Sequence, residues 1–432
     1  MARAGSLWRQ RDFMSLWSGV TVSEVGTQVS QLALPLAALN VLHTGSLGVG
    51  VLRALETLPY LLIGLPAGVW VEHRRRRPVL MWSDGVRLVV IGSVPVAYAL
   101  GHLTLAQMYV AAFVAGLASV LFNIAYRSYL PRLLDHSQLL DGNAKLSLSE
   151  SVAQVGGPGI AGVLIGLVGP APAVALDAVS FAASALGVRA VRTPEPSPPA
   201  RRPGATTTSL VVAGLRYVAG RPLLRRLTVC TTLGNLSIAM LETVLVVYLA
   251  RTLHLGAGSI GVVFLIGGTG VVVGALIAAR VTRLLGYGPA VIVAMAVAAA
   301  GAALAPLAPG DHRGMWLVAA SQWVAQLGVS VYSVSQVTLR QALCPDSLQS
   351  RMNATVRFLS WGVIPVGNLV GGVIGATLGL RGALWVSVAV AASSVPWLVP
   401  RAVRSVRALP EQEPDPGPPA AAGGDVRETA SL

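Results

Sequence analysis

Twelve apolar stretches, each long enough to cross a lipid bilayer, constrain this chain more than any other feature. A helix that spans the hydrocarbon core needs about 20 apolar residues, and these stretches follow one another with short connections. Of the residues, 54% are hydrophobic, only 12% are charged, and the mean hydropathy is +0.67, whereas soluble domains carry roughly 25% charged residues. The sequence therefore predicts an all-α membrane protein. The expected spans are residues 14–42, 47–71, 79–101, 104–126, 144–168, 172–189, 227–250, 258–280, 288–308, 314–339, 353–379 and 381–400.

A segment rich in Pro, Arg and Thr divides the twelve spans into two groups of six. This segment, "RAVRTPEPSPPARRPGATTTS" (189–209), is typical of a linker and too polar to cross a membrane. We therefore expect an N-terminal half over residues 1–189, a cytoplasmic linker over 190–223 and a C-terminal half over 224–401. Residues 402–432 run into a tail whose composition is typical of disorder, and we expect this tail to be cytoplasmic.

The distribution of basic residues predicts how the chain is oriented in the membrane. If the N-terminus is cytoplasmic, four of the 32 Lys and Arg residues lie at outward-facing ends, namely Arg53, Arg251, Arg313 and Arg381. The other 28 lie at the inner side, and such an excess marks the cytoplasmic loops of membrane proteins. Both termini are therefore expected in the cytoplasm. The two cysteines imply no disulfide framework.

An internal repeat relates the two expected halves. "VLHTGSLGVGVL" (41–52) resembles "TLHLGAGSIGVVF" (252–264), and "LPRLLDHSQLLDGNA", before the fifth span, resembles "LCPDSLQSRMNA", before the eleventh. Both pairs are separated by about half the chain. Repeats of this kind in a twelve-span protein are typical of secondary transporters, which hold their substrate between the two halves.

Two motifs carry a family resemblance. "GVWVEHRRRRPVL" (68–80) contains a glycine, an acid four residues later and a basic pair, and it resembles the loop motif between helices 2 and 3 of the major facilitator superfamily. "SVAQVGGPGIAG" (151–162) resembles the Gly-Pro motif in helix 5 of that superfamily's antiporters. Longer strings such as "RMNATVRFLSWGVIPVGNLVGG" look like the bacterial exporters that include macrolide efflux and enterobactin-export proteins. The residues that take the motif positions are Gly68, Glu72, Arg76, Arg77, Gly156, Gly157, Pro158, Gly159 and Gly162.

The resemblance implies two pseudo-symmetric six-helix bundles in the bacterial cytoplasmic membrane, with helices 5 and 8, and helices 2 and 11, packed together. Gly68 would then let helix 2 approach helix 11. The sequence departs from the family pattern at Glu72, which replaces the usual Asp, and at Arg75, which replaces a glycine. The fourth span also lacks the arginine that many drug/proton antiporters use for coupling. Proton coupling, if present, should therefore depend on other residues.

Acids within the expected spans are the candidates for that coupling. Glu24 shares a helical face with Gln28 and Gln31, and Glu242 shares its span with Asn235. A charge at this depth is costly unless it faces water or a partner. We expect these polar residues to face a central cavity in which Glu24 or Glu242 takes up protons or attracts a cationic substrate. The alternative is an acid that is hydrogen-bonded between helices and only stabilises their packing.

Three further groups of residues are expected to have roles in coupling, helix pairing or gating. Asp177, in the sixth span, is a coupling candidate, although a helix-packing hydrogen bond is favoured. Arg53 and Glu56 lie three residues apart, which predicts an ion pair near the outer rim. Glu72 is expected to cap an inner latch by pairing with a loop arginine or the start of helix 11. Asp84 and Arg87 are expected to extend this gating network.

The sequence contains no P-loop, HExxH motif or Cys/His cluster, so we expect no cofactor, no metal and no enzymatic activity. The arginine run 74–77 lies in a short loop between two spans, which argues against a nucleic-acid partner. We therefore predict a secondary transporter, acting as a monomer, that exports a small amphipathic compound by alternating access, with the proton as coupling ion. The alternatives are a metabolite importer or uniporter of the same fold, and a membrane-embedded enzyme or receptor that does not transport.

Overall fold

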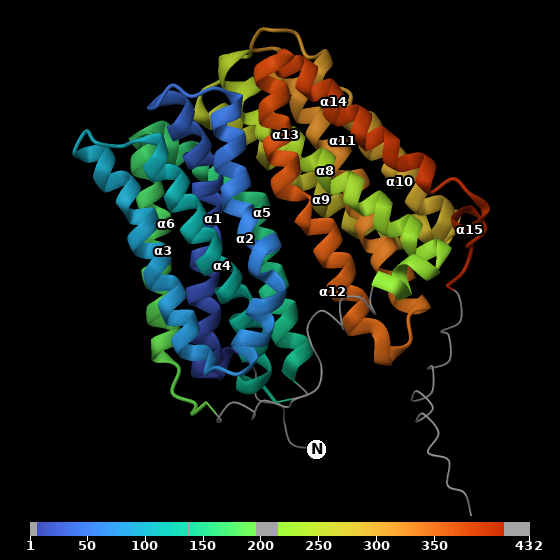
Figure 1. Cartoon of the computed structure of the whole chain (residues 1–432), viewed down its shortest axis with the longest axis horizontal. Coiled ribbons are helices and arrows are strands. Elements are labelled where there is room, and N and C mark those ends of the chain that lie inside the picture. Colours follow the sequence, from blue (N-terminus) through green and yellow to red (C-terminus); the bar gives the residue numbers. More distant parts are fainter. Residues whose placement is uncertain (1–6, 136–137, 196–214, 410–432) are drawn as a thin grey trace, which may run out of the picture.

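The computed structural model describes residues 7–135, 138–195 and 215–409, and these residues are almost entirely helical (Figure 1). Most of the expected linker and the acidic tail lie outside the described residues. Two sets of helices form two bundles. The N-terminal bundle contains α1 (Arg11–Asn40), α2 (Ser46–Glu72), α3 (Arg76–Ala99), α4 (Leu105–Leu133), α5 (Leu139–Val168) and α6 (Pro170–Ala190). The C-terminal bundle contains α8 (Pro222–Arg251), α9 (Ala257–Leu285), α10 (Tyr287–Ala302), α11 (Gly314–Leu343), α12 (Asp346–Gly362), α13 (Ile364–Thr377) and α14 (Gly379–Ser394).

Ten membrane spans are recognised among the described residues by length and composition, and one of them, Met352–Thr377, includes both α12 and α13. The break between α12 and α13 falls at Val363, just before Pro365. Proline lacks the backbone donor that a continuous helix needs, which explains the interruption. With α1 and α14, each bundle has six membrane helices. The chain is therefore an all-α, twelve-helix membrane protein, as predicted.

The two bundles meet at one end and diverge at the other (Figure 1). We call the end where α6 finishes and α8 begins the linker end, and the opposite end the far end. Near the far end α2 packs on α13, and α5 packs on α9. A Cβ atom added to Gly372 would lie 2.9 Å from the Cα of Gly50, and one added to Gly261 would lie 2.9 Å from the Cα of Gly162. Glycine at these four positions therefore permits the closest backbone contacts between the bundles.

These close contacts follow the internal repeat. Gly50 and Gly261 occupy matching places in the two repeated strings, and Gly162 and Gly372 are separated by a nearly equal interval of about half the chain. His43 and His254 also match, and they adopt left-handed backbone conformations with φ of 53° and 52°. Such values are uncommon for residues other than glycine. The repeat in the sequence is therefore a repeat in structure, and it relates the α2–α13 contact to the α5–α9 contact.

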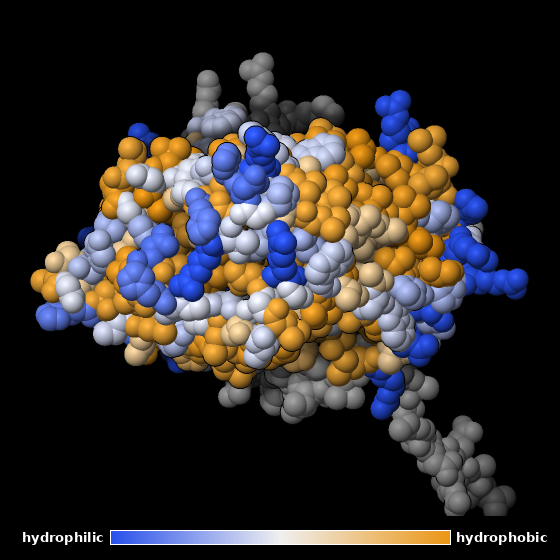
Figure 2. Space-filling model, turned by 90° about the horizontal axis from the view of Figure 1, so that it is seen from above, coloured by the Kyte–Doolittle hydropathy of each residue, from blue (hydrophilic) through white to orange (hydrophobic). Residues whose placement is uncertain are grey.

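The surface of the two bundles is suited to lipid. Large hydrophobic side chains are exposed along the helices, among them Val89, Leu167 and Leu186. Figure 2 looks along the helices onto the far end, where hydrophilic residues lie among hydrophobic ones. Apolar side chains in such numbers on an outer surface are expected where the solvent is a bilayer rather than water.

Candidate functional site

A cavity of about 880 Å³ lies between the two bundles. Its walls come from α1, α2 and α5 on one side and from α8, α9 and α11 on the other. Ligand pockets for drug-sized molecules have volumes of roughly 300–1,000 Å³. The cavity thus has the size and position expected of a substrate site between two halves. Its strongly polar lining residues are Gln28, Gln31, Arg53, Ser151, Gln154, Glu242 and Gln326.

Gln28 and Gln31, on α1, line this cavity at the positions that their spacing suggested. Gly157 makes room for Gln28, because a Cβ at that position would lie 2.4 Å from the Cβ of Gln28. Glu24 lies one helical turn nearer the linker end and does not line the cavity. Its charged neighbours are Glu150, Arg87 and Arg127. The polar face of α1 therefore has two parts. Gln28 and Gln31 line the cavity, and Glu24 lies among charged residues closer to the linker end.

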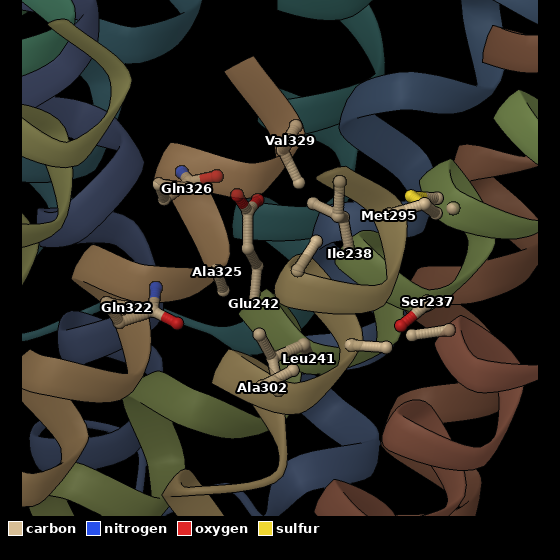
Figure 3. Close-up of a pocket in the computed structure, with 14 residues that line it drawn as sticks. Ser237, Ile238, Leu241, Glu242, Met295, Ala302, Gln322, Ala325, Gln326 and Val329 are labelled. Atoms are coloured by element: carbon tan, nitrogen blue, oxygen red, sulfur yellow. The ribbon is translucent and has the colours of Figure 1, made fainter. Parts of the chain in front are cut away.

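Glu242, on α8, lines the central cavity and also a small pocket of about 50 Å³ inside the C-terminal bundle. Its carboxylate is directed toward the amide of Gln326, and Ile238 and Met295 line another side of the small pocket (Figure 3). A volume of this size is enough for water when polar groups are present to bind it. Glu242 therefore lies at the boundary between the substrate-sized cavity and a chamber large enough to hold water.

Arg53 lies inside the cavity and not at the outer rim, which corrects the expectation from sequence. α2 begins at Ser46, so Arg53 is seven residues into the helix, or about 10 Å along its axis. Its guanidinium donates a hydrogen bond of 3.0 Å to the carbonyl oxygen of Gln31. The described residues form no Arg53–Glu56 ion pair. Arg53 and Glu242 therefore present a basic and an acidic side chain to one cavity from the two bundles.

Two other predicted site residues are engaged elsewhere. The side-chain amide of Asn235 donates to the carbonyl oxygen of Ser360 at 2.6 Å, which joins α8 to α12. Asp177 is buried between α6 and α1, where its carboxylate accepts from Ser180 at 3.3 Å and from Thr27 at 3.5 Å. Neither residue lines the central cavity. Asp177 thus has the packing hydrogen bonds that were favoured for it.

Asn368, on α13, is a functional candidate that the sequence analysis missed. Its amide nitrogen donates to the carbonyl oxygen of Arg53 and to the hydroxyl of Thr57, both at 3.2 Å. Its amide oxygen accepts from Thr243 at 3.1 Å. The residue therefore joins α2 of one bundle to α8 and α13 of the other. A single amide in the apolar string "NLVGGVIGATLG" was the available signal.

Gln322 and Gln326, on α11, were also missed. Gln326 lines the central cavity, and both residues line the small pocket beside Glu242. They are spaced four residues apart, so they share a helical face in the same way as Gln28 and Gln31 share theirs. The reasoning applied to α1 would have found them.

The loop between α2 and α3 is organised by an acid from beyond α6. The carboxylate of Glu195 accepts from the backbone amides of Arg76 and Arg77 at 2.6 and 3.2 Å, and lies 3.8 Å from the guanidinium of Arg76. A carboxylate at a helix N-terminus is stabilising. Glu72 is exposed, and its backbone carbonyl accepts from Arg76. Among the described residues, Glu195 therefore has the capping role that was expected of Glu72.

Gly68 and the Asp84–Arg87 pair also differ from expectation. Nothing lies within 4 Å of a Cβ placed on Gly68, so this glycine makes no close contact with a neighbouring helix. Asp84 and Arg87 form a buried ion pair. The guanidinium of Arg87 lies 4.2 Å and 4.3 Å from the ring centroids of Phe122 and Phe181. The pair thus belongs to the interior of the N-terminal bundle and not to the loop network.

Asp12, before the apolar part of α1, binds the chain just after α6. Its carboxylate accepts from the backbone amides of Arg192 and Thr193 at 3.2 and 2.8 Å. Burial opposes the charged form, but these hydrogen bonds and that from the Thr193 hydroxyl outweigh it and lower the pKa of Asp12. The carboxylate is therefore charged at neutral pH, and the start of the linker segment is attached to the N-terminal bundle.

The Gly-Pro string of α5 faces three different surroundings. Gly157 contacts Gln28, Gly159 faces Leu265, and Gly162 contacts the backbone of α9. Gly156 and Pro158 line the central cavity. The string therefore lies where α5 leaves the α9 contact and becomes a wall of the cavity.

A family model described as the transmembrane secretion effector matches residues 4–419. The chain therefore belongs to this family of major facilitator superfamily transporters. The chain is 28% identical over 280 residues to the uncharacterized MFS-type transporter y4rN of Sinorhizobium fredii, covering 63% of this chain and 67% of the relative. It is 29% identical over 231 residues to the multidrug efflux pump Tap of Mycolicibacterium fortuitum, covering 51% of this chain and 55% of Tap.

Solved structures share the fold. A bacterial homologue of the iron transporter ferroportin in its inward-facing state has a TM-score of 0.73 and 18% identity, covering 91% of this chain and 98% of that chain. An outward-facing structure, also titled as a bacterial ferroportin homologue, has a TM-score of 0.59, with 90% and 98% covered. At this identity the likeness shows the fold alone. The chain is thus a multi-pass membrane transporter of the major facilitator type.

Proposed function

We propose that this protein exports a small amphipathic compound from the cell by alternating access and exchanges it for protons. The observation that carries the proposal is the placement of Glu242 in a substrate-sized cavity between the two halves, beside a chamber large enough for water. An acid at this depth can exchange a proton with water and can also attract a cationic substrate. The similarity to an efflux pump over half of the chain supports export.

The proposal includes an orientation. The linker end carries most of the 32 basic residues, and the positive-inside rule places such an end in the cytoplasm. The cavity lies on this side of the glycine contacts, so the described conformation would face inward. The higher TM-score to the inward-facing neighbour than to the outward-facing one supports this assignment. Export would then begin with loading of the cavity from the inner side.

Transport of ethidium, a fluorescent cation, into proteoliposomes with an acidic lumen tests the proposal. Antiport predicts that ethidium accumulates in the lumen while protons leave it, which a pH-sensitive dye records. Glu242→Gln is expected to abolish accumulation driven by the pH gradient but to retain exchange of ethidium across the membrane, because binding remains while proton release is lost.

The same assay on Glu24→Gln compares the two candidate acids, because Glu24 lies outside the cavity, among charged residues nearer the linker end. Asp311→Asn, in an exposed loop, is the matched control and should transport as the wild type does. Equilibration of ethidium without accumulation, whatever the pH gradient, would indicate a uniporter. Depletion of ethidium from the acidic lumen, with protons leaving together with it, would indicate a proton-coupled importer. Either result would overturn the proposal.

A further inference from the structure

The central cavity extends into the space between α5 and α9. Near the far end these helices touch, and of the glycine contacts between them the one nearest the linker end joins Val155 to Gly268, where an added Cβ would lie 3.0 Å from the Cα of Val155. Beyond this contact the cavity is lined by Leu148 and Val152 from α5 and by Val272 and Leu276 from α9.

These four side chains lie on the helix faces that formed the contact. Val152 and Leu148 are three and seven residues from Val155, and Val272 and Leu276 are four and eight residues from Gly268, so each set continues the same face of its helix. All four residues are exposed, with 61% of Val152 and 77% of Leu276 accessible. The helices have therefore separated along faces that would otherwise pack on one another, and the cavity reaches the opening between them.

The chemistry of the cavity changes along this direction. The inner part presents the amides of Gln28 and Gln326 with the basic Arg53 and the acidic Glu242, whereas the border of the opening is mainly aliphatic and includes Ser151 and Gln154 as its polar members. Leu148 and Leu276 are each four residues, about 6 Å, inside the linker-end limits of the expected spans 144–168 and 258–280. Val152 and Val272 are eight residues, about 12 Å, inside them, so the opening lies within the leaflet at the linker end. An exposed aliphatic border at this depth faces hydrocarbon.

We propose that the gap between α5 and α9 is a lateral portal through which a substrate with an aliphatic chain enters the cavity from the bilayer leaflet at the linker end. The polar group of the substrate binds at the glutamine and charged residues. Its chain lies between Val152 and Val272, and passes Leu148 and Leu276. One continuous cavity serves both parts, so a single amphiphile occupies it. This inference rests on the proposed export function and specifies its substrate class as lipid-partitioned amphiphiles.

A photoreactive probe tests occupancy of the portal. A dodecylamine with a diazirine at the chain terminus is added to the full-length protein in liposomes, illuminated, and the labelled peptides are identified by mass spectrometry. The portal predicts that labelling concentrates within residues 148–155 and 268–276 and that an excess of unmodified dodecylamine removes it. Labelling spread evenly over the exposed hydrophobic surface would overturn the portal.

Tryptophan substitutions test whether the portal is used. Val152→Trp and Leu276→Trp fill the gap, and Val163→Trp and Leu284→Trp are matched controls. Val163, on α5, is 61% exposed like Val152, and Leu284, on α9, is 77% exposed like Leu276. Neither control residue lines the cavity. The transported probes are two dansyl-labelled amines that differ only in a butyl or a dodecyl chain.

Because tryptophan adds a large rigid side chain, the portal variants should slow dodecyl-probe transport at least about tenfold and butyl-probe transport less than about twofold. Both controls should transport both probes at the wild-type rate. Wild-type rates in the portal variants, or equal losses for both probes, would overturn the proposal. Concentrated labelling without any transport by the wild type would instead contradict the export function and leave the portal as a lipid-binding site.

Discussion

The α2–α13 and α5–α9 contacts begin alike at the far end and differ about three helical turns toward the linker end. Both start at a glycine pair, Gly50 with Gly372 and Gly261 with Gly162. Further along, a Cβ on Gly362 would lie 2.8 Å from Leu61, and the rings of Tyr60 and Trp361 are in edge contact at 6.2 Å. The repeat equates Leu61 and Gly362 with Val272 and Val152, which are exposed and line the cavity.

The two contacts also differ in how they are held. Asn368 joins α13 to α2 through hydrogen bonds, and its counterpart in the repeat is Pro158. The described residues form no side-chain hydrogen bond between α5 and α9. Aliphatic surfaces can separate into lipid without leaving polar groups unpaired. Separation of α13 from α2 would instead leave the amide of Asn368 without its hydrogen-bond partners on α2. The difference teaches that, in this conformation, one contact is held by hydrogen bonds between the bundles, whereas the other is open toward the bilayer.

The largest loss of transport rate is expected from substitutions at the glycine pairs, where the two contacts are alike. In Gly162→Leu, the new Cβ would lie 2.8 Å from the carbonyl oxygen of Ala257 and 3.0 Å from the Cα of Gly261. In Gly372→Leu, it would lie 2.9 Å from the Cα of Gly50. Overpacking of this kind costs about 1–3 kcal/mol, which corresponds to about 5- to 150-fold, so both variants should lose about fivefold or more in transport rate. Transport of the ethidium probe in proteoliposomes measures the loss.

Gly166→Leu is the control for this pair of variants. Gly166 is on α5, one turn beyond Gly162, and nothing lies within 4 Å of a Cβ placed there. Its substitution should leave transport close to the wild-type rate. Equal losses in Gly166→Leu and Gly162→Leu would mean that α5 tolerates no bulk at all, and the closeness of the glycine contact would not explain the effect.

An intermediate loss of transport rate is expected from a substitution at Asn368, where the two contacts differ. Asn368→Leu removes the hydrogen bonds to Arg53, Thr57 and Thr243. Hydrogen bonds between membrane helices contribute about 0.6 kcal/mol on average, with a maximum near 1.7. The variant should therefore transport about three- to tenfold more slowly than the wild type. Thr377→Val, on the same helix, removes a bond that stays within α13 and should have no effect. A wild-type rate for Asn368→Leu would contradict the proposed difference.

The smallest effect is expected at the exposed end of the α2–α13 side. The guanidinium of Arg251 donates to the carbonyl oxygen of Thr44 at 2.6 Å, which links the bundles at the far end. The bond is exposed, and bonds of this kind contribute about 1 kcal/mol or less. Arg251→Ala should therefore change the transport rate by less than about fivefold. A larger loss would mean that the far end depends on this bond more than on its glycine contacts.

Much of this architecture was predictable because it depends on patterns that membranes impose. The apolar spans, the polar break and the repeat each reflect hydrophobic length or symmetry, and all three can be read without knowing which helices touch. Gln28 and Gln31 were found because an i, i+3 polar pair on an apolar helix stands out. The glycines of α5 were found through the family motif, and the structure places Gly162 against α9.

The remaining site residues depend on tertiary contacts that no local pattern encodes. The position of Arg53 near the start of its span suggests the outer rim. Its long side chain reaches into the cavity because the carbonyl oxygen of Gln31, on another helix, accepts from its guanidinium. Glu195 was missed because it lies far from the α3 N-terminus in sequence, although its carboxylate is 2.6 Å from the amide of Arg76. Asp84 and Arg87 are near the loop in sequence. However, the aromatic rings that pack against the guanidinium of Arg87 come from α4 and α6, so the pair lies inside the bundle.

Collision rates of nitroxide labels in liposomes test the unequal contacts most directly. A label is attached through Val272→Cys or through Leu61→Cys, and the wild type measures the background because Cys230 and Cys344 are buried. Oxygen reports contact with lipid and a water-soluble nickel chelate reports contact with water. The account predicts frequent oxygen collisions at residue 272, at the lateral opening, and infrequent collisions with both reagents at residue 61. Equal oxygen collision rates at the two positions would contradict it.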